Sequence, residues 1–259
     1  MSHVLKTQHA LRWTAICLLS TIACRPGWAT HPLLTDDTAV QGAGGWQLEL
    51  NTDRSTSHPN GVRHIDQQLN TTLTYGLADT LDLAFSQPTS WQRPSNVGHH
   101  SGINDSATGL KWRFWEDKDA GWSMGLRPTI TLPIGNAKQG FGNGRSTVDI
   151  TLLSQLEQGP WQWLINAGLR YNGNTTGERK QMWNASTALL YNLGSSWTFA
   201  AELTANRNPN RNAPANLRTA MLGAIYHNSS KTDIDLGLRR NWQRSVEATT
   251  VGAGITQRW

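Results

Sequence analysis

The stretch TVGAGITQRW, residues 250–259, alternates between two kinds of side chain along its whole length. One face of an extended chain would carry Val251, Ala253, Ile255, Gln257 and Trp259, and the other Thr250, Gly252, Gly254, Thr256 and Arg258. A period of two residues indicates a β-strand with two different faces. An aromatic residue at the end of such a strand is typical of the closing strand of a transmembrane barrel, where the ring lies at the membrane interface. The stretch therefore predicts a chain that crosses a membrane as strands.

The other end of the chain predicts a signal peptide that is removed on export. Two basic residues precede an apolar run at 14–23, and the small residues Gly27 and Ala29 precede a cleavage point before Thr30. This run is shorter than the roughly 20 residues that a membrane helix needs. The predicted organisation is a signal peptide (1–29), a periplasmic N-terminal segment (30–45) and an outer-membrane barrel (46–259).

Both cysteines, Cys17 and Cys24, lie in this leader, so the mature chain has none. A chain without thiols suits export through an oxidising compartment. Lipidation of Cys24 is a second interpretation, but residues 21–23 lack the leucine that normally opens a lipoprotein signal.

The charge of the mature chain is close to balanced. Three of the 23 Lys and Arg residues and none of the 18 Asp and Glu residues lie in the leader, which leaves 20 minus 18, or +2. Nucleic acid is therefore not an expected partner.

Twelve segments of the mature chain alternate with a period of two. They are 46–51, 65–77, 80–87, 106–115, 121–133, 146–157, 161–172, 182–193, 197–206, 216–227, 232–240 and 247–259. Most have the length that a tilted strand needs to cross the hydrocarbon. The predicted fold class is all-β, a transmembrane antiparallel up-and-down β-barrel of about 12 strands.

The connections between these segments alternate in length. Short turns follow the even segments, as at Ala78–Asp79 and Gly194–Ser196, and longer polar loops such as 88–105 and 134–145 follow the odd ones. A bacterial barrel with short periplasmic turns and long outer loops produces this alternation. The sequence therefore predicts the outer membrane of a Gram-negative bacterium, with both ends of the barrel in the periplasm.

Tryptophans provide an independent indication of the membrane interface. Eight of them fall toward the predicted periplasmic rim: Trp46, Trp112, Trp115, Trp122, Trp161, Trp163, Trp197 and Trp259. Three tyrosines, Tyr75, Tyr191 and Tyr226, end strands at the same level. The core of a soluble β-sandwich would not produce this one-sided clustering.

The same alternation assigns charged side chains to the lumen. The predicted lumen-lining residues are Glu49, Asp82, Lys111, Arg113, Arg127, Asp149, Arg170, Glu202, Arg218, Asp235 and Arg239. One interpretation is that they pair across neighbouring strands and stabilise the wall, with Asp82 and Asp149 neutralising nearby cations. The alternative is a charged pore wall, for which Lys111, Arg113 and Arg127 form the best local cluster and would favour anions.

Four stretches in order carry a family resemblance: HPLLTDDTAVQGAGGWQLEL (31–50), YGLADTLDL (75–83), DSATGLKWRF (105–114) and LRPTITLPIGNAKQGFGNG (126–144). The chain resembles the outer-membrane transporter family associated with the meta-pathway of phenol degradation. This resemblance implies a channel or transporter for small solutes, including aromatic or anionic organic compounds. Gln257 departs from the apolar residue usual at that place in a closing strand, and Trp259 stands where Phe is commoner.

Twelve strands predict a lumen of intermediate width. Two segments are candidates to narrow it: the glycine-rich loop from Gly135 to Gly144, and segment 30–45, whose Asp36 and Asp37 could meet inward arginines. The alternatives are a solvated loop and a mobile tail.

Other functions receive less support from the sequence. A lipid-modifying enzyme would need a histidine beside the serine it activates. His227 with Ser229 lies at a predicted turn, and His99 and His100 precede Ser101 in an outer loop. We expect no catalytic residues, no metal and no cofactor, and a structural barrel without transport remains the main alternative.

The expected partners are outer-membrane lipid and lipopolysaccharide, a small-molecule solute, and the barrel-assembly machinery, which would recognise the strand ending at Trp259.

The loop alternation generates a topology prediction. A tag inserted near Asn96 or Asn210 should be labelled in intact cells, whereas a tag at Ser195 should be labelled only after the outer membrane is permeabilised. Labelling at Ser195 in intact cells would contradict the predicted orientation.

Overall fold

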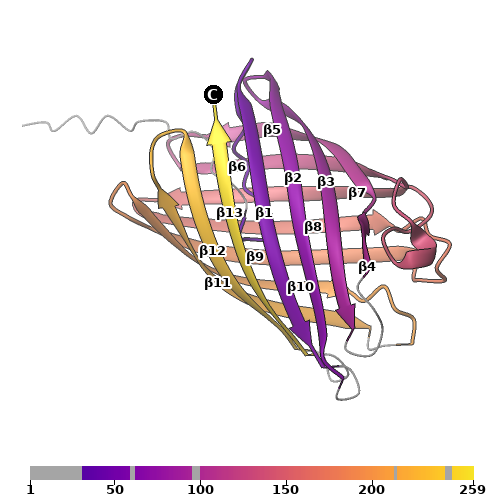
Figure 1. The fold of residues 1–259 in the computed structure, drawn as a ribbon. Helices are drawn as coiled ribbons and strands as arrows, with labels where there is room; N and C mark the ends of the chain where they lie inside the picture. The colour runs from indigo at the N-terminus through magenta and orange to yellow at the C-terminus, as the bar shows by residue number, and fades with distance from the viewer. Residues whose placement is uncertain (1–30, 59–61, 95–99, 213–214, 243–246) are drawn as a thin grey trace, which may run out of the picture.

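The computed structural model describes residues 31–58, 62–94, 100–212, 215–242 and 247–259, and the predicted signal peptide lies outside them. Twelve antiparallel strands form a closed barrel (Figure 1). They are β1 (Trp46–Ser57), β2 (His64–Ala78), β3 (Leu81–Pro94), β5 (Ser106–Asp117), β6 (Trp122–Leu132), β7 (Thr147–Gln158), β8 (Trp161–Tyr171), β9 (Gln181–Leu193), β10 (Trp197–Arg207), β11 (Asn216–His227), β12 (Thr232–Trp242) and β13 (Ala248–Arg258). The predicted fold class and strand number are confirmed. In the described part of the chain no helix is both long and apolar enough to cross a membrane.

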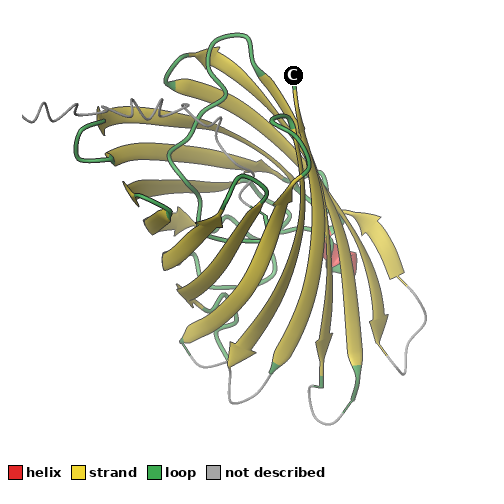
Figure 2. Ribbon diagram, turned by 90° about the vertical axis from the view of Figure 1, so that its left-hand side faces the viewer, coloured by secondary structure: helices red, strands yellow, loops and turns green. Residues whose placement is uncertain are grey.

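The barrel closes where β1 pairs with β13, from Gln47 opposite Arg258 to Ser57 opposite Ala248. Every other barrel strand pairs with its neighbours in sequence, so the strands curve around one interior (Figure 2). The short strand β4 (His100–Ile103) pairs only with the outer part of β3 and is not one of the strands that form the barrel wall.

Two strands are longer than the sequence predicts. β1 continues from 51 to Ser57, and β3 continues from 87 to Pro94. Both extensions lie at the outer end, where the outward face meets polar headgroups and water instead of hydrocarbon. Alternation fades there because neither face has to be apolar.

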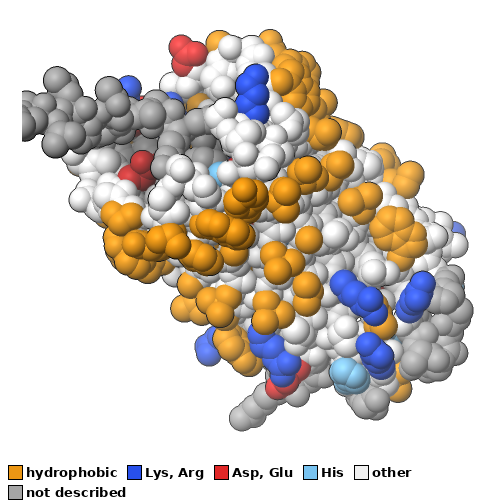
Figure 3. Space-filling view, turned by 60° about the vertical axis from the view of Figure 1, so that its left-hand side comes forward, with side chains coloured by type: hydrophobic (Ala, Val, Ile, Leu, Met, Phe, Trp, Pro, Cys, Tyr) orange, Lys and Arg blue, Asp and Glu red, His pale blue; other side chains and the backbone are white. Residues whose placement is uncertain are grey.

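The outward face of the barrel is apolar and the inward face is mostly polar. Leu169 and Leu222 each expose 67% of their surface outward, whereas the inward Leu153 and Leu164 expose 0% and 2%. Figure 3 shows exposed apolar side chains as a band across one face of the barrel. This arrangement is the inverse of a soluble protein and matches a barrel that contacts lipid.

Aromatic pairs mark the predicted periplasmic rim, as the sequence indicates. Ring centroids lie 4.5 Å apart in Trp46–Tyr75, 4.7 Å apart in Trp161–Tyr191 and 4.9 Å apart in Trp197–Tyr226. Each pair joins the first residue of one strand to a residue near the end of its neighbour. These tilted pairs form an aromatic belt at the interface.

The glycine-rich outer loop packs on its neighbours and does not enter the lumen. Phe141, which is 1% exposed, covers Gly102 on β4, where an added Cβ would lie 2.5 Å from the ring. The Asp105 carboxylate accepts hydrogen bonds from the N–H groups of Gly135 and Asn143, at 2.9 and 2.7 Å. This loop, with its short helix η2 (Ala137–Gln139), therefore buttresses the outer rim.

The barrel seam generates a prediction for Trp259. Its N–H donates to the Trp46 carbonyl at 3.1 Å, and its own carbonyl accepts from the Trp46 N–H at 3.2 Å. Deleting Trp259 removes these two bonds, each worth about 1 kcal/mol, and one ring of the belt. We expect less heat-modifiable, folded barrel in the outer membrane on gel electrophoresis. An unchanged folded yield would show that the residue is dispensable for assembly.

Candidate functional site

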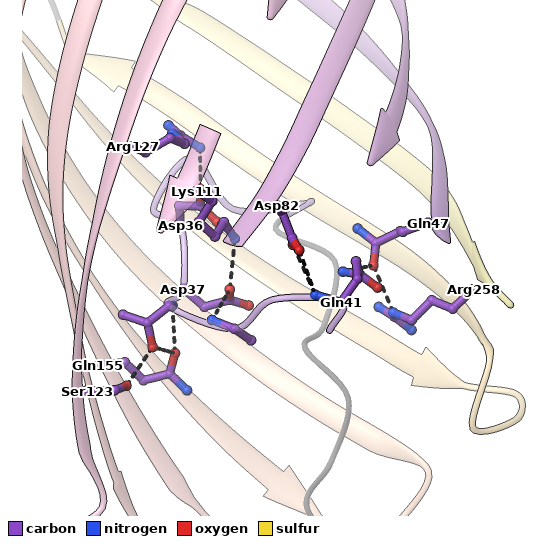
Figure 4. Close-up of polar contacts among 12 residues, drawn as sticks. Asp36, Asp37, Gln41, Gln47, Asp82, Lys111, Ser123, Arg127, Gln155 and Arg258 are labelled. Atoms are coloured by element: carbon purple, nitrogen blue, oxygen red, sulfur yellow. Dashed lines mark hydrogen bonds and ion pairs between the residues drawn. The ribbon is translucent and has the colours of Figure 1, made fainter. Parts of the chain in front are cut away.

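Segment 31–45 lies inside the lumen and contains neither helix nor strand. At its foot the Gly44 N–H donates to the Gly76 carbonyl at 2.9 Å, which attaches it to the periplasmic end of β2. From there it crosses the interior (Figure 4), and seven of its first eight residues are buried. We call residues 31–45 the plug segment. The burial of these residues in the lumen contradicts the alternative interpretation, in which this segment is a mobile tail.

Two wall cations hold the middle of the plug segment (Figure 4). Lys111 Nζ donates to Asp36 Oδ1 at 2.7 Å and to Asp37 Oδ1 at 3.1 Å. Arg127 pairs with the second oxygen of Asp36. Because the Asp36 side chain is only 2% exposed, its charge is compensated by these cations in place of bulk water.

Neutral and acidic wall side chains bind the plug segment closer to its foot. Thr38 Oγ1 lies 2.6 Å from Ser123 Oγ, and the Thr38 N–H donates to Gln155 Oε1 at 3.0 Å. The Gln41 N–H donates to both carboxylate oxygens of Asp82, at 3.1 and 3.0 Å. These contacts attach the segment to β3, β6 and β7.

At β10 the wall supplies the negative charge and the plug segment supplies the hydrogen-bond donors. The Glu202 carboxylate accepts from the Leu34 N–H at 2.9 Å and from the N–H and hydroxyl of Thr35. Next to it, Leu33 packs in a buried apolar cluster with Leu164 and Met221. Leu164 is the one apolar residue on the otherwise polar inward face of β8, and the plug segment explains it.

His31, at the start of the described plug segment, contacts carboxylates of two wall strands. Its Nδ1 bonds to the Asp235 carboxylate, and its Nε2 lies 3.7 Å from Asp53, which also accepts from Arg239 at 2.7 Å. Burial alone lowers the pKa of His31, but the hydrogen bond to Asp235 and the nearby Asp53 carboxylate outweigh burial and raise its pKa to about 9. The imidazole is therefore protonated at neutral pH and forms a third charged contact with the wall.

A row of glycines makes room for this end of the plug segment. Gly223, Gly237 and Gly252 lie directly opposite one another on β11, β12 and β13. A Cβ added at Gly223 or Gly237 would lie 2.5 Å from Pro32. The missing side chains thus form a recess into which Pro32 fits.

A cavity of about 770 Å³ occupies the lumen next to the plug segment. Its floor includes Asp36, and its wall carries amide and hydroxyl side chains, among them Asn51, Gln68, Asn70 and Thr72. The volume is in the range of small-molecule sites. The lumen is therefore not filled throughout.

The structure places ten of the eleven predicted lumen residues on the inward face, where they alternate with exposed apolar residues. They do not form one cluster. Arg170 pairs with Asp149, Arg239 with Asp53, and Arg113 lies 3.6 Å from Glu116. Glu49 is buried between the plug segment and the wall.

The assignment of Arg218 to the lumen is wrong. On β11 the inward residues are Thr219, Met221 and Ile225, which are 7%, 2% and 1% exposed. Arg218 shares the other face with Leu222 and points outward. It lies near the outer end of its strand, where a guanidinium can reach the headgroup region. The predicted bounds 216–227 match the strand, but the faces are reversed because the apolar Met221 and Ile225 face the interior, so apolar character does not mark the lipid face of β11.

The partners of the cation cluster also differ from the prediction. Among the described residues, neither Asp82 nor Asp149 forms an ion pair with Lys111, Arg113 or Arg127, although Asp82 lies opposite Lys111 on the neighbouring strand. Asp36 and Asp37 form ion pairs with Lys111, and Asp36 also pairs with Arg127. Pairing across strands could not reveal this, because the anions come from a segment outside the sheet.

The sequence analysis missed a buried network at the periplasmic end of the seam. Arg258 donates from Nη1 to Asp233 and from Nε to Gln47, each at 2.8 Å. Asp233 also bonds to His227 Nδ1 at 2.8 Å. The alternation in 250–259 places Arg258 on the polar face, which is the sequence signal for a polar partner inside the barrel.

The residues considered for catalysis have other roles in the structure. His227 Nε2 lies 2.8 Å from Thr198 Oγ1 inside the barrel, whereas Ser229 accepts from the N–H groups of Lys231 and Thr232 in the β11–β12 turn. His99 lies outside the described residues. Within the described ranges no group of three or more His, Cys, Asp or Glu side chains is placed to hold a metal ion.

A family model described as "Putative MetA-pathway of phenol degradation" matches residues 32–259. The match includes most of the plug segment and the whole barrel. A search of curated proteins finds no significant sequence match.

Solved structures share the fold at low identity. An outer-membrane channel from Pseudomonas putida F1 superposes with a TM-score of 0.70 at 17% identity, covering 86% of this chain and 98% of that one. The NanC porin gives 0.60 at 10% identity, with 81% and 98% covered. The translocator domain of the autotransporter NalP from Neisseria meningitidis gives 0.54 at 12% identity, with 84% and 89% covered.

The glycine recess generates a prediction about the plug segment. Gly223→Val should push Pro32 out of the recess, at a cost of about 1–3 kcal/mol in packing. With Leu33→Cys as a probe, maleimide labelling of the folded barrel should become faster. Ala224→Val, the outward neighbour on β11, is the control and should leave labelling slow. Equal labelling rates in the two variants would show that the recess does not hold the segment.

Proposed function

Because the chain belongs to the family described as "Putative MetA-pathway of phenol degradation", we propose that it is an outer-membrane channel for small solutes whose lumen is closed by its own plug segment. The cavity beside this segment carries the proposal, because it gives the closed barrel an internal space of about 770 Å³, lined by polar side chains, that a small solute can occupy. A solute enters this cavity and stops at Asp36, Leu33 and His31 until the segment shifts.

The bonds that hold the plug segment support such a shift. From His31 to Gln41, its described hydrogen bonds to the wall all end on wall side chains, among them Glu202, Gln155 and Asp82. Side-chain contacts can be broken one at a time, whereas the backbone ladder of the barrel stays intact. The plug segment can therefore leave the lumen without any loss of the backbone hydrogen bonds that stabilise the wall.

The charge balance of the lumen favours cations and neutral solutes. Among the described residues, more carboxylates than basic side chains face it: the carboxylates include Asp36, Asp37, Glu49, Asp53, Asp82, Asp149, Glu202, Asp233 and Asp235, and the basic side chains include Lys111, Arg113, Arg127, Arg170, Arg239 and Arg258. Protonated His31 does not remove the negative excess. In a narrow lumen the field of this excess is focused, so anions are disfavoured. This replaces the expectation of an anion-favouring zone at Lys111.

Uncharged phenolic compounds fit these properties and agree with the family description. A phenolic hydroxyl has a pKa of about 10 and stays neutral at pH 7. Amide and hydroxyl side chains such as Asn70 and Thr72 can exchange hydrogen bonds with it. A structural barrel without transport is the second candidate, supported by the number of contacts that hold the plug segment.

The closed barrel with its apolar band and aromatic belt is an outer-membrane barrel of the Gram-negative type, and lipid is its immediate neighbour. We further propose that the barrel-assembly machinery recognises β13 and that lipopolysaccharide surrounds the outer end.

The channel proposal predicts the effect of weakening one contact between the plug segment and the wall. Glu202→Gln removes the charge that holds Leu34 and Thr35, which weakens hydrogen bonds worth about 1.5–3 kcal/mol each. In planar bilayers we expect more frequent single-channel openings than for the wild type. Glu247→Gln, which removes a carboxylate outside the lumen, is the control. No current from either the wild type or Glu202→Gln would favour the structural barrel.

A second prediction concerns selectivity. Reversal potentials of the open state should show a preference for K⁺ over Cl⁻, and Asp149→Asn should move them toward Cl⁻ because a carboxylate that lines the cavity is lost. Glu247→Gln should not change them. An anion-selective wild type would contradict the proposed charge balance.

A further inference from the structure

Outward-facing arginines lie on the part of the barrel that runs from β10 through β13 and β1 to β3, with Arg54 on β1, Arg93 on β3 and three on adjacent strands. Arg207 on β10, Arg218 on β11 and Arg240 on β12 lie at the outer ends of their strands, on the same face as Leu203, Leu222 and Leu238. The strands β5 to β9 carry no outward Lys or Arg within their described residues. In Figure 3, basic side chains follow the lower edge of the apolar band.

Strand register fixes the spacing of these three arginines. Arg218 lies opposite Ala205, two residues from Arg207, and opposite Trp242, two residues from Arg240. It is thus a diagonal neighbour of both, at roughly 7–8 Å between Cα atoms. Three guanidinium groups therefore lie within reach of one headgroup.

These guanidinium groups are available to a ligand. Neither Arg207 nor Arg218 forms an ion pair or hydrogen bond within the part of the chain that the structure describes. Arg240 pairs with Glu247, but the two side chains are 49% and 60% exposed, and such surface pairs are weak. An external phosphate can compete for all three.

The surface beside the arginines fits acyl chains. Leu203, Leu222 and Leu238 are 59%, 67% and 51% exposed on the strands below the cations. Trp242, 51% exposed, lies directly opposite Arg218 at the level where amphipathic rings mark the interface. A matching ligand combines phosphate groups with several acyl chains.

We propose that Arg207, Arg218 and Arg240 form a binding site for the phosphorylated sugar headgroup of an outer-leaflet lipid, with the leucine surface below holding its acyl chains. Arginine suits this role because its planar guanidinium donates two parallel hydrogen bonds to a phosphate. The site lies at the outer end of the barrel, so the ligand is lipid A of lipopolysaccharide. The inference rests on the outer-membrane location and not on transport.

The test uses the whole barrel refolded in detergent without lipopolysaccharide. It is titrated with lipid A, with lipid A lacking both phosphates and with phosphatidylglycerol, and bound lipid is measured by native mass spectrometry. We expect R207Q/R218Q/R240Q to weaken lipid A binding about tenfold, because charge-assisted contacts are lost from an exposed site. K118Q/K231Q, which removes cations from periplasmic turns, is the control and should bind as the wild type does.

The possible outcomes distinguish binding through the phosphates of lipid A from binding through its acyl chains or through anionic charge in general. Equal binding of dephosphorylated lipid A, or no effect of the triple substitution, would overturn the site. Equal binding of phosphatidylglycerol would show a general anionic-lipid surface and overturn the sugar headgroup. If the triple variant does not fold on heat-modifiability gels, Arg218→Gln alone should weaken binding about threefold, and unchanged binding would overturn the proposal. Single-channel currents should be the same in all folded variants, so failure here leaves the channel proposal standing.

Discussion

The need to pair every backbone N–H and carbonyl within hydrocarbon is the constraint on which the whole structure depends. The β1–β13 seam meets it by leaving the sheet without an edge. Because side chains alternate between the two faces of a strand, closure of the barrel directs half of the side chains of each strand inward, where polar groups do not contact lipid. The ion pairs, the cavity and the plug segment follow from this sorting, since an enclosed polar space must be either hydrated or filled.

The plug segment fills part of that space by complementing the wall in charge and shape. Asp36 lies between two cations, Glu202 accepts donors from Leu34 and Thr35, and Pro32 occupies a recess without side chains. Each wall residue in these contacts would be costly to bury alone. Wall and plug segment therefore satisfy one another, and the remaining polar surface faces the cavity.

Period-two alternation predicted the fold because each strand is sorted by its own environment. It located Lys111, Arg127 and Glu202 on the inward face for the same reason. It failed at Arg218 because β11 carries the apolar Met221 and Ile225 on its inward face, so both faces of that strand are rich in apolar residues. It also failed to find the partners of Lys111, because Asp36 and Asp37 reach it from outside the sheet and no strand register connects them.

The glycine recess links the sequence of the plug segment to the sequence of the wall in related chains. Gly223, Gly237 and Gly252 come from three separate strands, yet they face the same few residues of the segment. A larger residue at Gly223 or Gly237 requires a smaller or displaced Pro32, whereas a smaller residue at position 32 relaxes both positions at once; a side chain at Gly252 would instead meet Asp53 and His31. Substitution in this region is therefore asymmetric: the segment can vary first, and the wall can follow.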